Sequence, residues 1–158
     1  MEGLKELKRL AYEASKAKYP SLPDHARVIH KYSDKSANSL TKCVIDYVNF
    51  KHGFAERVAN SGRYIDDSKI VTDCLGIRKI IGSGKWIKGS GVNGSADVHF
   101  IYKGISVKTE IKMKDSQSEA QKRYQKSIEE AGGHYWIVRS FNEFLQKFNE
   151  TFQEGGVC

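Results

Sequence analysis

The chain has 158 residues, of which 39% are hydrophobic and 28% charged, a composition typical of a globular protein rather than of a disordered chain. Its formal net charge of +7 favours a polyanionic partner, of which nucleic acid is the commonest. No apolar run is long enough to span a membrane, and the first residues lack the apolar core of a signal peptide. Three widely separated cysteines match neither a zinc motif nor a disulfide framework, so we expect a cytoplasmic protein without a membrane partner.

The N-terminal 35 residues predict a helix followed by a basic arm. Leucine and alanine recur at helical spacing over 2–18, and the segment Tyr19-Pro20-Ser21-Leu22-Pro23 ends that helix because proline cannot continue it. Residues 24–35 show no clear period and interleave basic groups with an aromatic. This pattern suits phosphate contacts and stacking, and it suits a solvated connector equally well.

From residue 36 to about 154 the pattern predicts one α/β domain. A helix starts at Ser36 or Asn38 and closes at Gly53, and a short strand follows over 54–59. Residues 60–95 are rich in Gly, Ser and Asn and contain two strand candidates, 69–72 and 77–81. We interpret about 63–92 as an inserted β flap whose basic residues, including Arg63, Lys85 and Lys88, would clamp a nucleic-acid backbone.

The C-terminal third predicts a helix, a strand and a last helix. Ser116 is the expected cap of a helix that runs to Ala131 and ends at Gly132-Gly133. Residues 134–139 read as a strand, and a helix with an aromatic core stripe follows a cap at Ser140. The predicted fold class is therefore α/β, with helices flanking a mixed sheet.

Between the inserted flap and the helix that follows Ser116, residues 96–102 and 105–112 predict a β-hairpin with its turn at Lys103-Gly104. A two-residue turn places Asp97 opposite Glu110, and Lys112 on the same face as Glu110. Opposed carboxylates repel unless a cation lies between them, so the pattern favours a divalent-metal site with a lysine beside it. Exposed strands also carry such residues routinely. His99 alternates with Asp97, and it either lines this site or is structural.

These residues resemble a known family when they are taken in order. The segments Gly94-Ser95-Ala96-Asp97, Glu110-Ile111-Lys112, Ser118-Glu119-Ala120-Gln121 and Ala131-Gly132-Gly133 are similar to the PD-(D/E)xK nuclease superfamily, in particular the small VRR-NUC type often found in phage and in repair nucleases. Asn60-Ser61-Gly62 resembles the family's Asn/Gly turn, and Arg57 its nearby basic residue. The resemblance covers roughly residues 37–141 and implies a restriction-endonuclease-like core of α-β-β-β-α-β order.

The resemblance also implies an activity and a set of roles. Asp97, Glu110 and the Ile111 carbonyl would hold Mg²⁺ or Mn²⁺, Lys112 would position the attacking water, and Gln121 would orient water or phosphate. The chain would then be a metal-dependent DNA nuclease in the cytoplasm, which is the host's cytoplasm if the protein is phage-encoded. Structure-specific DNA such as flaps or junctions is one substrate that the resemblance suggests. The expected nucleic-acid contacts are Arg57, Asn60, Arg63, Lys85, Lys88 and Lys114.

One departure from the family pattern leaves an alternative open. Members usually carry a glutamate in the helix before the first strand, where this chain has Asn38 and Ser39, and Glu56 and Asp46 are the candidate substitutes. The chain is therefore either a nuclease, acting with one or two metal ions, or a non-catalytic nucleic-acid-binding protein that keeps the nuclease fold, as a virion or regulatory component. An enzyme of this size would need a homodimer or another partner to cut both strands.

Overall fold

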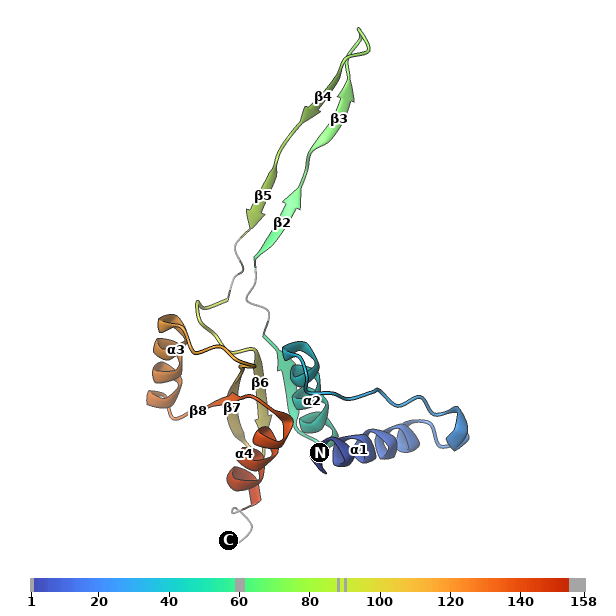
Figure 1. Ribbon diagram of the computed structural model, residues 1–158, viewed down its shortest axis with the longest axis vertical. Coiled ribbons are helices and arrows are strands. Elements are labelled where there is room, and N and C mark those ends of the chain that lie inside the picture. Colours follow the sequence, from blue (N-terminus) through green and yellow to red (C-terminus); the bar gives the residue numbers. More distant parts are fainter. Residues whose placement is uncertain (1, 59–61, 88, 90, 154–158) are drawn as a thin grey trace. The chain divides into compact units, whose positions relative to one another are not determined.

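The computed structural model describes residues 2–58, 62–87, 89 and 91–153 and divides the chain into two compact units. The first unit joins Met1–Val58 to Gly94–Cys158, and the second is Ala59–Asn93. The first contains α1 (Glu2–Lys18), a 3-10 turn (Asp24–Ala26), α2 (Ala37–Phe50), β1 (Phe54–Arg57), β6 (Val98–Tyr102), β7 (Ile105–Ile111), α3 (Glu119–Glu130), β8 (His134–Val138) and α4 (Phe141–Gln153) (Figure 1). The second contains β2 (Arg63–Asp66), β3 (Lys69–Thr72), β4 (Arg78–Ile81) and β5 (Gly84–Ile87).

A mixed four-stranded sheet of order β1-β6-β7-β8 forms the centre of the first unit. β1 and β7 run antiparallel to β6, whereas β8 runs parallel to β7, with α3 as the crossover. The β6–β7 hairpin has the predicted register, in which Tyr102 faces Ile105. Its two turn residues, Lys103 and Gly104, both have positive φ, as a two-residue hairpin turn requires. The coarse α/β prediction is therefore confirmed.

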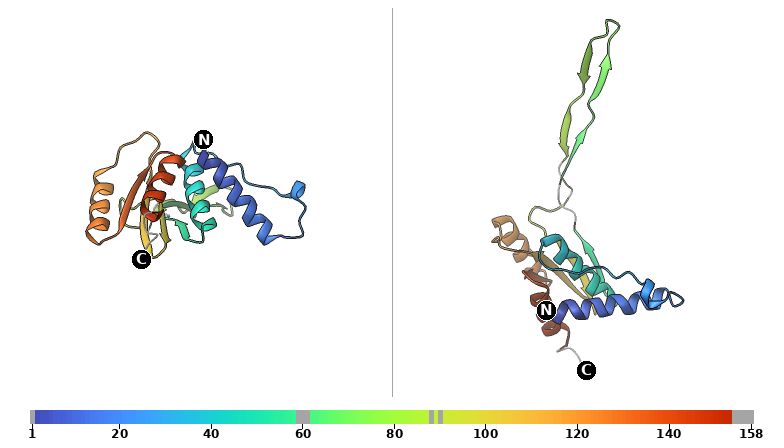
Figure 2. Two further views of the ribbon diagram at one scale, coloured as in Figure 1. Left: turned by 90° about the horizontal axis from the view of Figure 1, so that it is seen from below. Right: turned by 45° about the vertical axis from the view of Figure 1, so that its right-hand side comes forward.

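α2 and α4 cover one face of this sheet, and α1 packs on these two helices to complete the core. Leucine and valine from α2 and phenylalanine from α4 meet buried strand residues, among them Phe100, whose ring lies 5.4 Å from that of Trp136. In the left view of Figure 2, α4, α2 and α1 lie in succession, and α3 lies apart beyond β8. α1 buries Leu7 and Ala11 in this same core, so the predicted N-terminal helical extension packs as part of the first unit.

The opposite face of the sheet is polar. Alternate residues of β6 and β7 point away from the core, so that His99, Lys108 and Glu110 share this second face. On β8 the residue paired with Lys108 is Tyr135, whose ring lies 6.2 Å from that of Tyr124 on α3. α3 therefore covers the part of the polar face where β7 and β8 meet. Glu110 and Tyr135 are buried there, while Glu56 on β1 stays exposed.

The second unit is a hairpin of two antiparallel ribbons. The inner ribbon pairs β2 with β5 and the outer ribbon pairs β3 with β4, of which the sequence predicted only the outer pair. The tip between β3 and β4 is held by Asp73, whose carboxylate accepts from the backbone N–H groups of Leu75 and Ile77. The predicted flap, about 63–92, thus falls inside this unit.

Of the three expected N-terminal caps, two are confirmed. Ser36 caps α2 by accepting a hydrogen bond from the Ser39 amide, and Ser140 accepts from the Glu143 amide at the start of α4. The predicted cap at Ser116 is wrong. Ser118 caps α3 instead and forms a capping box with Gln121, although Ser116 also has a suitable partner, Glu119, three positions later. The C-cap of α3 is Ala131, as expected.

Candidate functional site

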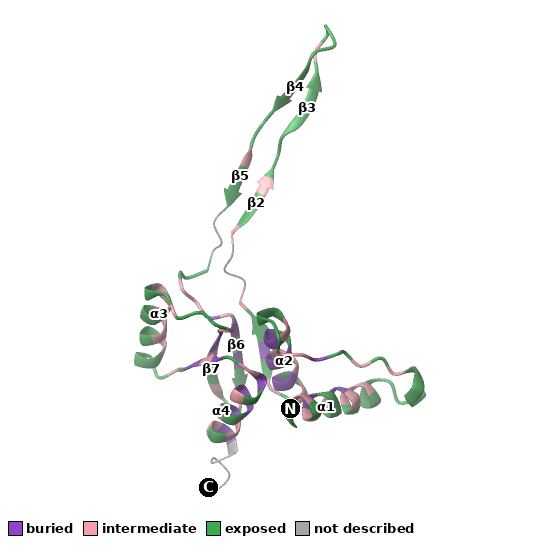
Figure 3. Ribbon diagram, viewed as in Figure 1, coloured by how far each residue is buried: buried purple, intermediate pink, exposed green. Residues whose placement is uncertain are grey.

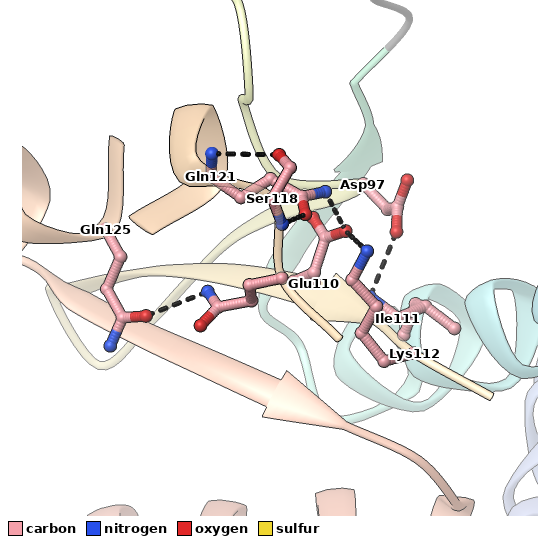
Figure 4. A network of polar contacts seen from close by, with 8 residues as sticks. Asp97, Glu110, Ile111, Lys112, Ser118, Gln121 and Gln125 are labelled. Carbon is pink, nitrogen blue, oxygen red and sulfur yellow. Dashed lines mark hydrogen bonds and ion pairs between the residues drawn. The ribbon is translucent and has the colours of Figure 1, made fainter. Parts of the chain in front are cut away.

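Glu110 lies near the end of β7 with a side chain that is only 4% exposed. Its Oε1 accepts from the Gln121 Nε2 at 2.5 Å and lies 3.2 Å from the Lys112 Nζ. Its other oxygen, Oε2, is buried without a hydrogen-bond partner among the described residues. Figure 4 shows this carboxylate at the centre of the polar network. A buried carboxylate oxygen without a partner is costly, so this oxygen points to a ligand.

Asp97 lies directly before β6 and is fastened by both its backbone and its side chain. Its carbonyl oxygen accepts from the Val58 amide at 2.9 Å, and its Oδ2 accepts from the Ile111 amide at 2.9 Å. Continuing the β6–β7 register by one pair brings Asp97 opposite Glu110, and Figure 4 shows the two carboxylates around the end of β7. The structure thus brings together Asp97, Glu110, Ile111, Lys112 and Gln121, as the sequence predicted.

The electrostatics of Glu110 follow from this arrangement. Burial raises the pKa of the Glu110 carboxyl above its ordinary value, and the neighbouring Asp97 charge raises it further. The Lys112 ammonium and the hydrogen bond from Gln121 act in the opposite direction, without cancelling the rise. A cation bound between Asp97 and Glu110 would oppose both effects that raise this pKa, because it favours the ionised form of the carboxylate.

Gln121 has two tasks at the start of α3. Its side-chain oxygen accepts from the Ser118 backbone N–H at 2.9 Å, while its side-chain NH₂ donates to Glu110. The cap thereby fixes the orientation of the amide, with its donor end toward the carboxylate. Gly94 lets this helix start come close, because it has φ +83 and a Cβ there would lie 2.5 Å from the Ala120 carbonyl.

The helix position that lacks the expected acid is occupied by an amide. Asn38, in the first turn of α2, accepts a hydrogen bond from the Arg57 guanidinium at 3.0 Å. Asp46 is engaged elsewhere, by the Tyr32 hydroxyl at 2.8 Å and Lys42 at 3.0 Å. Glu56 does lie on the polar sheet face, where its carboxylate is 3.4 Å from His99 Nδ1. Asp46 is thus held away from the site by Tyr32 and Lys42, whereas Glu56 shares the sheet face of Glu110.

The other expected nucleic-acid contacts divide between the two units. Lys114 is exposed in the loop after β7, and Arg57 lies on β1. Arg63 and Lys85 lie on the inner ribbon of the second unit, on the same face. The remaining two, Asn60 and Lys88, lie outside the described residues.

Of two further residues near the site, Tyr135 was not found from the sequence and His99 was left open by it. Tyr135 pairs with Lys108 and therefore shares the sheet face of Glu110; burial raises the pKa of its hydroxyl, and the charge of Glu110 adds to this effect. His99, left open by the sequence, bonds Ser106 Oγ through Nε2 at 3.0 Å and lies on the polar face two residues from Asp97. The parallel pairing of β8 with β7 is the signal that would have found Tyr135, because it fixes which β8 residues share the Glu110 face.

Comparison with protein-family models and with curated proteins finds no match for this chain. Within the described residues, no three His, Cys, Asp or Glu side chains gather as a metal-binding group. Among those same residues, no helix is both long and apolar enough to cross a lipid bilayer. The interpretation of the site therefore depends on its geometry and charge.

Proposed function

We propose that the chain is a metal-dependent nuclease with a restriction-endonuclease-like core, which hydrolyses phosphodiester bonds in DNA. The observation that carries this proposal is Glu110: a buried carboxylate, oriented by Lys112 and Gln121, with an unpartnered oxygen and a second carboxylate, Asp97, beside it. A purely structural carboxylate would be expected to have both oxygens satisfied.

The donor set fits a hard divalent cation. Asp97 and Glu110 offer carboxylate oxygens, and Ile111, whose amide already bonds Asp97, offers a backbone carbonyl in the same segment. Mg²⁺ and Mn²⁺ prefer such oxygen ligands and keep several waters, so two carboxylates and a carbonyl suffice. When bound, such an ion lowers the pKa of a coordinated water and stabilises negative charge on the phosphoryl oxygens.

The residues of the chain supply the remaining functions. Lys112 Nζ, 3.2 Å from Glu110, neutralises part of the carboxylate charge and is placed to orient a water molecule and to offset charge that develops at phosphorus. Gln121 holds Glu110 in one rotamer, since its own amide is fixed by the Ser118 cap. The basic residues contribute phosphate contacts that position the substrate without reading its sequence.

A cleavage assay combined with a binding assay tests this proposal. Wild-type protein should cut supercoiled, single-stranded, flap and four-way-junction DNA with Mg²⁺ or Mn²⁺, and EDTA or Asp97→Ala should abolish cutting. Isothermal titration with Mn²⁺ gives a readout that is independent of activity, and Asp97→Ala should weaken binding there too. Cleavage that survives both EDTA and Asp97→Ala would contradict the metal site. Adding RNA substrates to the same cleavage assay shows whether the protein cuts DNA or RNA.

A second function, binding without cleavage, is favoured by the Asn38–Arg57 contact. Asn38 stands where the family pattern has an acid, and it lines a hollow of about 300 Å³ with Arg57, Lys42 and Asp46. Lys42 is paired with Asp46, so Arg57 and the Asn38 amide are the groups that suit a phosphate there. DNA binding that is retained without cleavage of any substrate, under every metal condition, would support this second function over the first.

A further inference from the structure

The second unit presents an unusual amount of apolar surface. We call its described residues 62–87 the arm, and most of it is exposed in Figure 3. Its large apolar residues have 39–81% of their surface exposed; they are Tyr64, Ile70, Val71, Leu75, Ile77, Ile80, Ile81, Trp86 and Ile87. An isolated two-stranded ribbon is at best marginally stable in water, and exposed apolar patches of this kind mark interaction surfaces.

The two faces of each ribbon differ in charge. On the inner ribbon, Tyr64 pairs with Trp86 on one face, whereas Arg63 and Lys85 lie on the other. On the outer ribbon, Ile70 pairs with Ile80 on one face, and Lys69 and Lys79 lie on the other face together with Val71 and Ile81. We call the faces that carry the pairs Tyr64–Trp86 and Ile70–Ile80 the apolar faces, and the opposite ones the basic faces.

The charges on these faces indicate different partners. Each basic face carries two cations and, among its paired residues, no acid, although Lys79 Nζ lies 3.5 Å from the Asp73 carboxylate at the tip. The other three cations suit phosphates and repel a second copy of the same face. The apolar faces carry one acid, Asp66, and one base, Arg78, among their paired residues, so together they are neutral. A neutral apolar face is compatible with a second copy of itself, whereas aliphatic side chains such as Ile70 and Ile80 offer DNA no hydrogen bonds.

The area of an apolar face is also of the right order. Twelve or so residues per strand at ~3.3 Å per residue, with strands ~4.8 Å apart, give a ribbon of roughly 40 Å by 10 Å. With the relief of large side chains, such a face approaches the ~800 Å² that each partner contributes to a stable interface. The four residues of the two apolar pairs are 61–73% exposed, so nearly all of this area is open in the single chain.

We propose that the apolar faces of the arm bind the corresponding faces of a second copy of this chain, forming a homodimer. The arms of the two copies pack face to face as sheets do and bury Tyr64, Trp86, Ile70 and Ile80 of each copy. The basic faces remain on the outside of the dimer, where they can bind nucleic acid. This interface does not depend on the proposed hydrolysis and holds equally for a protein that only binds.

Sedimentation of the full-length chain tests the proposal. Wild type should be dimeric at ~10 μM, and Ile70→Asp with Ile80→Asp should raise the dimer dissociation constant at least ~100-fold, because four buried isoleucines per dimer are replaced by charges. The matched control is Val71→Asp with Ile81→Asp, the same change on the basic face of the same ribbon. It should leave the dissociation constant within about threefold of wild type.

Trp86 fluorescence provides a second readout. Trp86 is 67% exposed in the single chain, whereas Trp136 is 7% exposed, so the difference between wild type and Trp86→Phe isolates Trp86. Its emission should shift to the red and become quenchable by acrylamide on dilution below the dissociation constant. A monomer at ~100 μM whose Trp86 is protected only by added duplex DNA would overturn the proposal in favour of a nucleic-acid contact. A dimer that tolerates both variant pairs would overturn it by placing the interface elsewhere.

Discussion

The double role of Gln121 leads to a prediction that separates the helix cap from the site. Gln121→Ala removes two hydrogen bonds, one that caps α3 at Ser118 and one that satisfies the buried Glu110. Ser118→Ala removes only the cap contact to the Gln121 amide. The two variants therefore differ mainly by the bond to the carboxylate.

The structure sets the expected magnitudes at neutral pH. Loss of a serine cap costs about 1 kcal/mol in free energy of unfolding. Loss of a hydrogen bond to a buried charged group costs about 1.5–3 kcal/mol, and the second, neutral bond adds about 0.5–1.5 kcal/mol. We thus expect about 2–4 kcal/mol for Gln121→Ala and about 1 kcal/mol for Ser118→Ala, both measured by urea unfolding without divalent ions.

The pH dependence gives the sharper test. The Gln121 bond lowers the pKa of Glu110, which burial and Asp97 hold above its ordinary value, so Gln121→Ala should raise that pKa further. The loss in free energy of unfolding that Gln121→Ala causes beyond that of Ser118→Ala should then be largest where Glu110 is ionised. It should shrink as the pH falls through the raised pKa of Glu110. The cost of Ser118→Ala should not change with pH. Equal costs for the two variants, or a cost of Gln121→Ala that is the same at neutral and acid pH, would refute this reasoning.

Two further predictions concern the metal and the core. Mn²⁺ at 100 times its dissociation constant should stabilise the wild type by about 2.7 kcal/mol, or roughly 5–10 °C in Tm. The same Mn²⁺ concentration should not stabilise Glu110→Gln. The affinity of the wild type for Mn²⁺ should fall as the pH drops through the raised pKa of Glu110. Without metal, the contribution of Glu110 to stability is fully present below its ordinary pKa and is lost as the pH rises through the raised one, so Glu110→Gln should flatten the pH profile of Tm. Phe100→Ala should cost about 3–5 kcal/mol in urea unfolding, because Phe100 is fully buried among the rings of Trp136 and α4; a cost below about 1 kcal/mol would contradict the core.

The site was predictable where local chemistry determines geometry. Lys103-Gly104 specifies a two-residue turn, the turn fixes the register, and the register brings Asp97 opposite Glu110. The spacing of Glu110 and Lys112 then places both side chains on one face, and their 3.2 Å contact follows. None of these steps needs information from distant parts of the chain.

The parts that were missed depend on distant pairing or on competing caps. The β2–β5 ribbon is exposed, so neither strand shows the alternation that burial imposes, and the sequence 63–66 and 84–87 gave no strand signal. Ser116 and Ser118 are equally good caps by residue type, and each has a capping-box partner three positions later, Glu119 or Gln121. The local sequence therefore does not decide between them, whereas in the structure Gln121 also bonds Glu110 on β7. The place of α1 in the core required knowing that Leu145 of α4 would meet Gly3.

The charge of the site runs against the charge of the chain, and the metal proposal accounts for both. A net charge of +7 attracts a polyanion, yet the site itself places two carboxylates, Asp97 and Glu110, against one ammonium, Lys112. Phosphate would be repelled from such a place unless a cation neutralised it. If the carboxylates served only structure, then Asp97→Asn with Glu110→Gln should strengthen DNA binding at low salt. If they hold a metal ion, the same substitutions should remove the dependence of DNA binding on Mg²⁺ or Mn²⁺. Measuring the DNA affinity of the wild type and of the double variant, each with and without the ion, decides between a structural and a metal-binding role.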